Sequence, residues 1–187
     1  MIKKLHFFLE YLKNPKQIGA VASSSKFLIK SIIDEIDFHK SHCIVELGAG
    51  QGNITKVLLR KLPKKSKLLA FEINKKFVKD LRKIKDKRLV VVENSAENLE
   101  KYILSNGFKK ADYIIGALPI TLWPKKVVDN LLKNIKYCLR KKGKYVQYAS
   151  YLRHYQILTK YFKNKNIKLK YTLLNIPPTF IYVCEKE

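Results

Sequence analysis

The stretch Glu46-Leu47-Gly48-Ala49-Gly50-Gln51-Gly52 decides the fold of this 187-residue chain. It follows an apolar run with strand character, His42–Leu47, and opens directly into a helical pattern, Asn53–Leu62. In that context glycines let the backbone approach a ligand closely at the carboxyl end of a parallel strand, although many strand-to-helix turns use glycine for geometry alone. The stretch therefore predicts the first βα unit of a parallel sheet, with a candidate ligand site at its turn.

Strand and helix patterns continue to alternate along the rest of the chain. The further expected strands are Leu68–Glu72, Leu89–Glu93, Asp112–Ile115 and Lys144–Tyr148, and helices are expected over Lys75–Ile84, Glu97–Ser105, Lys125–Leu139 and Leu152–Phe162. Two alternating stretches, Ile167–Leu174 and Thr179–Cys184, are split by a proline-containing loop and predict an antiparallel hairpin. We therefore expect an α/β fold with a seven-stranded, mostly parallel sheet that ends in a C-terminal antiparallel hairpin.

The beginning of the chain differs from these repeating units. We interpret residues 1–40 as N-terminal amphipathic or lid helices and residues 41–187 as the ligand-binding domain, together one globular unit. Met1–Leu12 places apolar side chains on one helical stripe, and Ser23-Ser24-Ser25 offers an N-cap for a second helix, Ser25–Ile36. The first helix can lie in the headgroup plane of a membrane, or its stripe can simply cover the core of the domain.

The composition is strongly basic. Lys and Arg number 39 against 15 Asp and Glu, which gives a formal net charge of +24 at pH 7. An anionic partner is expected from that excess, although a lysine-rich composition can also be a general habit of a proteome. The hydrophobic fraction of 47% supplies a core, and no apolar run approaches the roughly 18 residues of a membrane span. Three scattered cysteines without metal-ligand spacing indicate a reduced cytoplasmic compartment and no metal site.

Two carboxylates flank the glycine turn and indicate what it binds. Glu46 opens the turn, and Glu72 ends the second expected strand, 22 residues after Gly50. A carboxylate at the tip of the second strand is placed to accept hydrogen bonds from ribose hydroxyls. An acid at the start of the turn suits a ligand with an ammonium group and would repel a pyrophosphate. Amine, sulfonium and ribose together describe S-adenosyl-L-methionine better than a dinucleotide.

The glycine turn and the spaced acid resemble the first two motifs of the class I S-adenosylmethionine-dependent methyltransferases, whose fold is Rossmann-like. In that family the residues after the third strand contact the adenine, and Ser95 and Ala96 stand at that place here. The resemblance implies S-adenosyl-L-methionine as the cofactor. We assign ten residues to the cofactor site: Glu46, Gly48, Gly50, Gly52, Glu72, Ile73, Ser95, Ala96, Gly116 and Leu118.

The loop after the fourth strand, Gly116-Ala117-Leu118-Pro119-Ile120, bears on the methyl acceptor. Ribosomal RNA adenine dimethyltransferases resemble this region but carry Asn-(Leu/Ile)-Pro-(Tyr/Phe), in which the amide and a carbonyl hold the base amine and the aromatic ring stacks on the base. Ala117 and Ile120 stand where that family has the amide and the aromatic ring. Methylation of a nucleobase is therefore disfavoured in spite of the charge.

Several other stretches resemble the bacterial phospholipid N-methyltransferases, which methylate phosphatidylethanolamine toward phosphatidylcholine. These are Phe8-Leu9, Pro15, Ile18–Leu28, Gly116–Pro119, Gln147-Tyr148 and Asn175-Ile176-Pro177-Pro178. The resemblance implies transfer of methyl groups to the primary amine of a lipid headgroup, and ornithine lipids would fit the same motifs. We expect an anionic membrane surface and an aminolipid as partners, and a cytoplasmic, peripheral location on the inner face of the cell membrane.

The acceptor amine arrives as an ammonium and must lose a proton before it attacks. Candidate catalytic or orienting groups are Tyr148, Tyr151 and His154 after the fifth expected strand and Tyr11 near the N-terminus, although each is a residue type that more often serves packing. Backbone carbonyls around Gly116–Leu118 are expected to hold the amine. Two alternatives stay open: an RNA methyltransferase of the rRNA adenine type, and a non-catalytic basic module that binds membranes.

Overall fold

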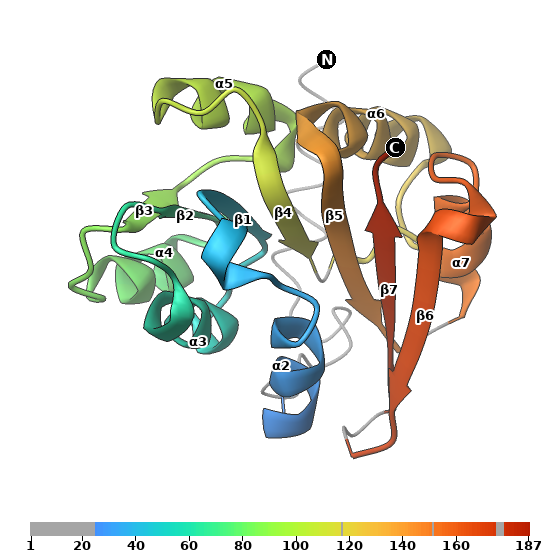
Figure 1. Cartoon of the computed structure of the whole chain (residues 1–187), viewed down its shortest axis with the longest axis horizontal. Coiled ribbons are helices and arrows are strands. Elements are labelled where there is room, and N and C mark those ends of the chain that lie inside the picture. The colour runs from blue at the N-terminus through green and yellow to red at the C-terminus, as the bar shows by residue number, and fades with distance from the viewer. Residues whose placement is uncertain (1–24, 117, 151, 175–177) are drawn as a thin grey trace.

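The computed structural model describes residues 25–116, 118–150, 152–174 and 178–187. Its centre is a seven-stranded sheet in the order β3-β2-β1-β4-β5-β7-β6 (Figure 1). The strands β1 to β5 run parallel, and β7 pairs antiparallel with both β5 and β6. The strand bounds are β1 Cys43–Leu47, β2 Lys67–Phe71, β3 Leu89–Val92, β4 Ala111–Gly116, β5 Leu139–Ala149, β6 Ile167–Thr172 and β7 Thr179–Glu185. The predicted α/β sheet with its terminal hairpin is confirmed.

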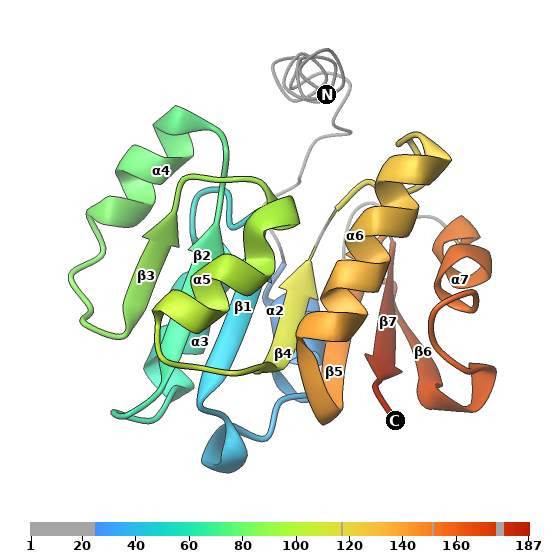
Figure 2. The same ribbon diagram turned by 90° about the horizontal axis from the view of Figure 1, so that it is seen from above.

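Helices cover both faces of the sheet, as Figure 2 shows. One face carries α2 (Lys26–Ile33), α3 (Asn53–Lys61) and α4 (Lys75–Arg82), and the other carries α5 (Leu99–Ser105), α6 (Lys125–Cys138) and α7 (Arg153–Leu158). Short 3-10 turns occupy Phe38–Lys40, Ala96–Asn98 and Asn164–Asn166. Within the described ranges, no helix combines the length and the apolar character that crossing a membrane requires.

The central strands are mostly apolar because both faces of the sheet are covered. In β1, Val45 and Leu47 join the core beneath α5 and α6, whereas Ile44 packs in the core beneath α2 and α3. Successive side chains of a strand point to opposite faces, so Glu46 lies on the same face as Ile44. All five residues of β1 are buried, which places a carboxylate inside the covered sheet.

The helix expected over Ser25–Ile36 is confirmed in a shorter form, as α2. The side chain of Ser25 caps it by accepting a hydrogen bond from the backbone N–H of Leu28 at 3.2 Å. The buried residues Leu28, Ile32 and Ile33 fix α2 on the sheet. The expected amphipathic helix Met1–Leu12 lies outside the described residues, as does the rest of residues 1–24.

The fifth strand begins earlier than the sequence pattern predicts, at Leu139 rather than Lys144. Pairing between β4 and β5 is interrupted between Ala111 and Tyr113, where β5 contains extra residues in a β-bulge. A Cβ on Gly143 would lie 2.9 Å from the carbonyl oxygen of Arg140, so the chain can fold back here only with glycine at this position. Hydrophobic periodicity missed this part of the strand because it is basic rather than apolar.

The order of the sheet reverses between β1 and β4. The chain passes from β1 through α3 to β2 on one side, and β4 then returns to the other side of β1. In open parallel sheets, the carboxyl ends of the strands at such a reversal leave a crevice where ligands bind. The turn Gly48–Gly52 and the loop that follows Gly116 both start at this reversal.

Gly52 fits tightly against the helix α4. It has a positive φ of 77°, and an added Cβ would lie 2.9 Å from Leu81 Cδ2 and 3.3 Å from Ile84 Cδ1. Gly107 has a similar φ of 84°, but nothing lies within 4 Å of a Cβ there. The two glycines therefore share the backbone constraint, and only Gly52 also carries a packing constraint.

We expect Gly52→Ala to lower the free energy of unfolding by about 2 kcal/mol more than Gly107→Ala does. Both variants strain a left-handed backbone, whereas only Gly52→Ala forces Leu81 to move. Denaturant titration of the two variants measures the difference. Equal losses would show that the contact with Leu81 imposes no constraint.

Candidate active site

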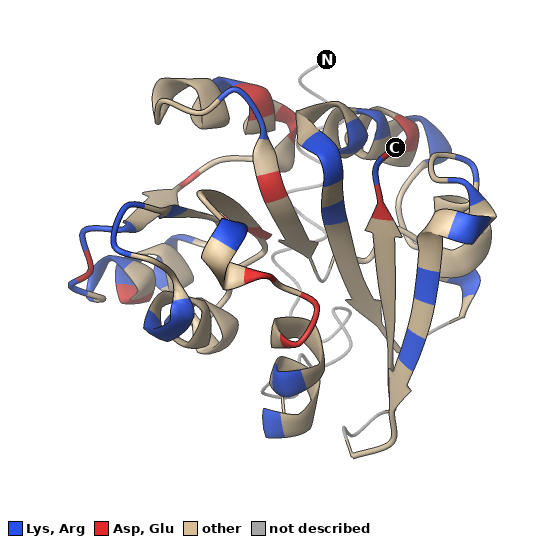
Figure 3. Ribbon diagram, in the orientation of Figure 1, with Lys and Arg blue, Asp and Glu red and all other residues tan. Residues whose placement is uncertain are grey.

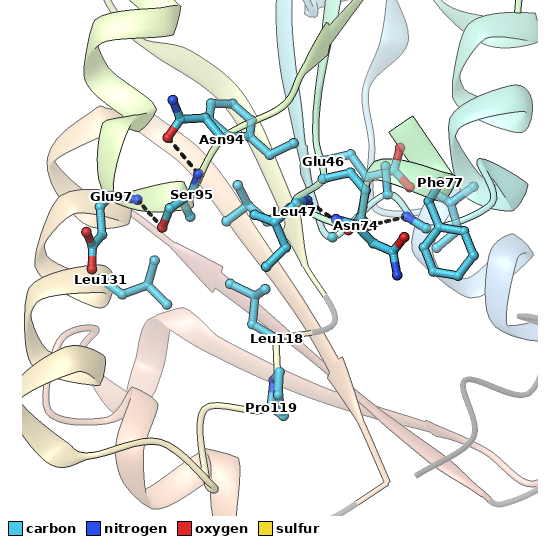
Figure 4. Close-up of a pocket in the computed structure, with 18 of the residues that line it drawn as sticks. Glu46, Leu47, Asn74, Phe77, Asn94, Ser95, Glu97, Leu118, Pro119 and Leu131 are labelled. Carbon is cyan, nitrogen blue, oxygen red and sulfur yellow. Dashed lines mark hydrogen bonds between the residues drawn. The ribbon is translucent and has the colours of Figure 1, made fainter. Parts of the chain in front are cut away.

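A pocket with a cavity volume of about 300 Å³ lies at the carboxyl ends of β1 to β4 (Figure 4). It is lined by the glycine turn, by the residues that follow β2 and β3, by the loop after β4 and by one side of α6. In Figure 4, Ser95 and Glu97 lie on one side of the space and Asn74 and Phe77 on the other, with Leu118 between. A cavity of this size suits a small organic ligand.

Glu72 joins the glycine turn to the segment after β2. Its Oε2 accepts a hydrogen bond from the backbone N–H of Gly50 at 2.8 Å, and its Oε1 accepts from those of Ile73 and Asn74, also at 2.8 Å. Oε1 therefore has both lone pairs engaged, whereas among the described contacts Oε2 has one left for a ligand. Glu72 lines the pocket, so that lone pair can accept a hydrogen bond from a ribose hydroxyl.

The backbone N–H groups at the start of the glycine turn point at acceptors within the protein. Those of Gly48 and Ala49 donate to the carbonyl oxygen of Phe71 at 2.9 and 3.0 Å, and that of Gly50 donates to Glu72. A phosphate-binding turn instead presents its N–H groups to the ligand. These three N–H groups are therefore not available to a pyrophosphate, which favours a ligand other than a dinucleotide.

The charge of the pocket is opposite to that of the chain. Three acidic side chains line it, those of Glu46, Glu72 and Glu97, and none of the described lining residues is Lys, Arg or His. Figure 3 shows the Lys and Arg residues along the outer helices and the edge strand β6. The pocket therefore favours a ligand with positive charge and disfavours phosphate groups.

Glu46 is buried at the base of the glycine turn, where only 4% of its surface is exposed. Its Oε2 accepts a hydrogen bond from the hydroxyl of Thr55 in α3 at 2.6 Å. Burial raises the pKa of Glu46 to about 8, with a further contribution from the charge of Glu72, while the hydrogen bond from Thr55 acts to lower it. A cationic ligand nearby would favour the ionised form of this carboxyl.

Most of the residues that the sequence assigns to the cofactor site line this pocket: Glu46, Gly48, Gly50, Glu72, Ile73, Ser95, Ala96 and Leu118. Gly52 and Gly116 are not among the lining residues. Gly52 instead packs against Leu81, and a Cβ on Gly116 would lie 3.6 Å from Leu47 Cβ and Gln147 Oε1. These two glycines shape the backbone beside the pocket.

Of the four predicted catalytic residues, Tyr148 lines the pocket. His154 does not: it is 1% exposed, and its ring stacks on that of Tyr182 with 5.9 Å between the centroids. The residue follows β5 in sequence, but α7 turns its ring toward β7. Tyr151 and Tyr11 lie outside the described residues. The predicted contribution of these two residues stays a prediction.

Apolar side chains that were not predicted from the sequence form a wall of the pocket. Trp123, Val127 and Leu131 line one part of it, and Phe77 in α4 lines another. Val127 and Leu131 are four residues apart on α6, so they share one helical face beside the pocket. That spacing was visible in the sequence, but it does not show whether such a face meets a ligand or the core.

The acceptor loop is fixed by a buried amide. The carbonyl oxygen of Leu118 accepts hydrogen bonds from the backbone N–H of Ile120 at 2.8 Å and from Nε2 of Gln147 at 2.9 Å. Gln147 is fully buried, and its Oε1 accepts a hydrogen bond from the hydroxyl of Tyr145. Both lone pairs of the Leu118 carbonyl are therefore engaged. The Leu118 carbonyl therefore has no lone pair left for the acceptor amine in this structure, and the expectation for the other carbonyls around Gly116–Leu118 stays a prediction.

The lining fits S-adenosyl-L-methionine. Glu72 has a lone pair for ribose hydroxyls, the nearby carboxylates suit its two cationic groups, and the apolar wall offers a surface for an aromatic base. Together with the reversal of strand order beside the glycine turn, these features define a class I S-adenosylmethionine-dependent methyltransferase.

Comparison with known proteins gives the family. Residues 12–134 match the model of the ribosomal RNA adenine dimethylases, and the chain belongs to this family. It is also similar to an ornithine lipid N-methyltransferase of Singulisphaera acidiphila, with 27% identity over 186 residues that span 98% of this chain and 96% of the relative.

Solved structures share the fold. A precorrin-6y C5,15-methyltransferase from Geobacter metallireducens superposes with a TM-score of 0.65 at 12% identity, over 87% of this chain and 90% of its own. Human N-acetylserotonin methyltransferase in complex with S-adenosylmethionine superposes with a TM-score of 0.62 at 16% identity, over 95% of this chain and 55% of its own. These structures confirm the predicted fold, and the match to a family of methylases confirms the predicted cofactor.

The raised pKa of Glu46 predicts a pH-dependent stability. Folding raises this pKa from 4.5 to about 8, so the folded state holds the Glu46 proton more tightly than the unfolded state does. The contribution of this difference to the free energy of unfolding is fully present below pH 4.5 and is lost as the pH rises to 8. Glu46→Gln removes the titration and keeps an oxygen for Thr55. We expect its melting temperature, relative to the wild type, to rise by roughly 3–5 °C per pH unit from about pH 5.5 to 8 and then to level off. A difference that is constant with pH would contradict a buried, titrating carboxyl.

We expect Glu72→Ala to weaken the binding of S-adenosyl-L-methionine by at least about 100-fold. The substitution removes the ribose acceptor and leaves three backbone N–H groups without their partner. Glu93→Ala is the matched control, because Glu93 follows the neighbouring strand β3 but pairs with Arg82 and does not line the pocket. Calorimetry should find the control unchanged. Wild-type affinity in Glu72→Ala would refute the assigned role.

Proposed function

We propose that this protein transfers methyl groups from S-adenosyl-L-methionine to the primary amine of a membrane lipid headgroup. The observation that carries the proposal is the state of the acceptor loop. Ala117 and Ile120 replace the two groups that would read a base, Ile120 is 1% exposed within the core, and the Leu118 carbonyl is held by Gln147. A nucleobase would find no aromatic ring to stack on at position 120, and the Leu118 carbonyl is already engaged.

The similarity to an ornithine lipid N-methyltransferase along nearly the whole of both chains supports a lipid amine. Phosphatidylethanolamine and ornithine lipids both present a primary amine near an anionic group. The resemblance of the N-terminal and acceptor-loop stretches to phospholipid N-methyltransferases favours phosphatidylethanolamine, and the similarity to the curated relative favours ornithine lipid. We therefore propose an aminolipid acceptor and test the two lipids side by side.

The residues of the chain bind and align the reactants. When bound, S-adenosyl-L-methionine supplies a methyl group that is attached to its sulfonium sulfur, and the sulfur becomes a neutral thioether when the methyl group is transferred. Glu72 holds the ribose, Glu46 offsets positive charge, and the wall formed by Trp123, Val127 and Leu131 excludes water from the reacting atoms. Tyr148, the predicted catalytic residue that lines the pocket, orients the acceptor amine through its hydroxyl.

The charge of the chain suits a lipid surface. Each Lys or Arg close to an anionic membrane contributes about 1 kcal/mol of attraction, and that attraction does not depend on any base sequence. A peripheral position on the inner face of the cell membrane follows from this proposal, with Met1–Leu12 as an additional amphipathic contact. The lysines hold the protein near its substrate, while the carboxylates of the pocket select the cofactor.

A ribosomal RNA adenine methyltransferase is the second candidate. The family match over residues 12–134 favours it, and a net charge of +24 suits a nucleic acid as well as a membrane. The two candidates share the cofactor half of the site and differ in the acceptor half, so the acceptor must be tested directly.

Purified protein and methyl-labelled S-adenosylmethionine are incubated with anionic vesicles that contain phosphatidylethanolamine or ornithine lipid, and in parallel with ribosomal RNA. We expect label in a lipid and none above background in RNA. Label in RNA alone would overturn the proposal in favour of the second candidate. Binding of the cofactor without transfer to any acceptor would favour a non-catalytic membrane-binding module. Glu72→Ala serves as the inactive control.

A further inference from the structure

The hairpin at the edge of the sheet ends in exposed apolar side chains. Tyr171 near the end of β6 is 69% exposed, and the next two apolar residues, Leu173 and Leu174, are 70% and 63% exposed. Leu173 and Leu174 form a turn that directly follows β6. We call Tyr171, Leu173 and Leu174 the hairpin tip. Single exposed apolar residues are common, but three within four positions at the end of a projecting hairpin mark an interaction site.

The hairpin tip lies at the same edge of the sheet as the pocket. β7 is antiparallel to β5, with Phe180 opposite Ala149, so the start of β7 lies beside the carboxyl end of β5. Thr172 of β6 is opposite Thr179 of β7, which puts the end of β6 at that edge as well. Figure 1 shows the hairpin projecting beyond the ends of the parallel strands. Whatever the tip binds will therefore lie on the side of the molecule that holds the pocket.

Basic side chains accompany the tip. Lys168 and Lys170 lie on β6 and share the single carboxylate of Glu35, just after α2, so the pair keeps a net positive charge. At its other end α2 begins with Lys26 and the 51% exposed Phe27, and Figure 1 shows this end on the same side of the molecule as the hairpin tip. Apolar side chains with lysines behind them suit an anionic bilayer, where the apolar groups enter the interface and the lysines meet the headgroups.

We propose that the hairpin tip is a membrane anchor: Leu173 and Leu174 insert into the interface of an anionic bilayer and turn the pocket toward the headgroups. The inference rests on the proposed function for its lipid acceptor. A second copy of the chain is a poorer occupant, because a tip of three side chains covers far less than the roughly 1,200–2,000 Å² of a stable protein interface. Transfer of leucine side chains from water is favourable without any specific partner.

A fluorescent probe at the tip tests insertion. The native residues Cys43, Cys138 and Cys184 are all buried, so in the folded full-length protein Leu174→Cys can be labelled selectively with an environment-sensitive fluorophore. The matched control is Leu104→Cys, because Leu104 is 54% exposed and lies near the end of α5, on another part of the molecule. Vesicles of phosphatidylglycerol and phosphatidylcholine should shift the emission of the first probe to the blue and leave the second unchanged.

A binding measurement accompanies the probe. Leu173→Ser/Leu174→Ser should reduce partition onto the same vesicles by about tenfold or more, while Leu104→Ser and the affinity for S-adenosyl-L-methionine stay at wild-type values. Equal shifts at both labelled positions would overturn the proposal, as would a probe at position 174 that is already shielded before vesicles are added. A dimer that only the double variant disrupts would assign the tip to a second copy and reject the anchor.

The lipid-methylation assay separates this inference from the proposed function. Methyl transfer to vesicle lipid without a shift at position 174 would reject the anchor and keep the function. A blue shift without methyl transfer to lipid would keep the anchor as a membrane contact and reject the proposed acceptor.

Discussion

The carboxylate of Glu72 holds the ligand site together. It is the common acceptor for three backbone N–H groups, one from the glycine turn after β1 and two from the segment after β2. Those turns belong to different βα units, and their relative position decides whether the pocket exists. A charged acceptor makes strong hydrogen bonds, and burial at 8% exposure protects them from water. The remaining lone pair of Oε2 then faces a space that the same carboxylate has helped to shape.

The second feature of the site is its charge. A chain of +24 encloses a pocket lined by three acidic side chains and, among its described residues, by no basic side chain. The two charges act over different ranges. Fields from exposed lysines fall off within roughly 8 Å in physiological salt, so they act on whatever surface the protein touches. The carboxylates lie in a less polar interior, where they discriminate between ligands that have already entered. Attraction to an anionic surface and preference for a cationic cofactor are thus compatible in one small domain.

The sequence was sufficient for the fold because its strands are short apolar runs between amphipathic helices, and such patterns have few alternatives. Glu46 and Glu72 were also predictable, since their positions at strand ends determine where they lie. The apolar wall was not predictable, because Val127 and Leu131 have the same spacing as any buried helical face. The position of His154 was not predictable either, because proximity in sequence to β5 does not decide which way α7 turns the ring of this residue. The start of β5 was missed because its residues are basic.

The acceptor side depends on a buried amide whose importance sequence patterns do not show. Nε2 of Gln147, together with the N–H of Ile120, engages both lone pairs of the Leu118 carbonyl, and Oε1 of Gln147 accepts a hydrogen bond from the hydroxyl of Tyr145. The loop after β4 is therefore held by a side chain from β5. This arrangement leaves the family relation to adenine dimethylases intact and argues for a different acceptor. Different residues therefore hold the two halves of the site in place: Glu72 holds the cofactor half, and Gln147 holds the acceptor half.

The central claim is that the pocket selects a cationic nucleoside and rejects phosphate groups. Parallel calorimetric titrations of the wild-type protein with S-adenosyl-L-methionine and with NAD⁺ test it most directly. We predict saturable binding of S-adenosyl-L-methionine and no measurable heat of binding for NAD⁺, because the N–H groups of Gly48, Ala49 and Gly50 already donate to Phe71 and Glu72. Binding of NAD⁺ with equal or higher affinity would contradict it.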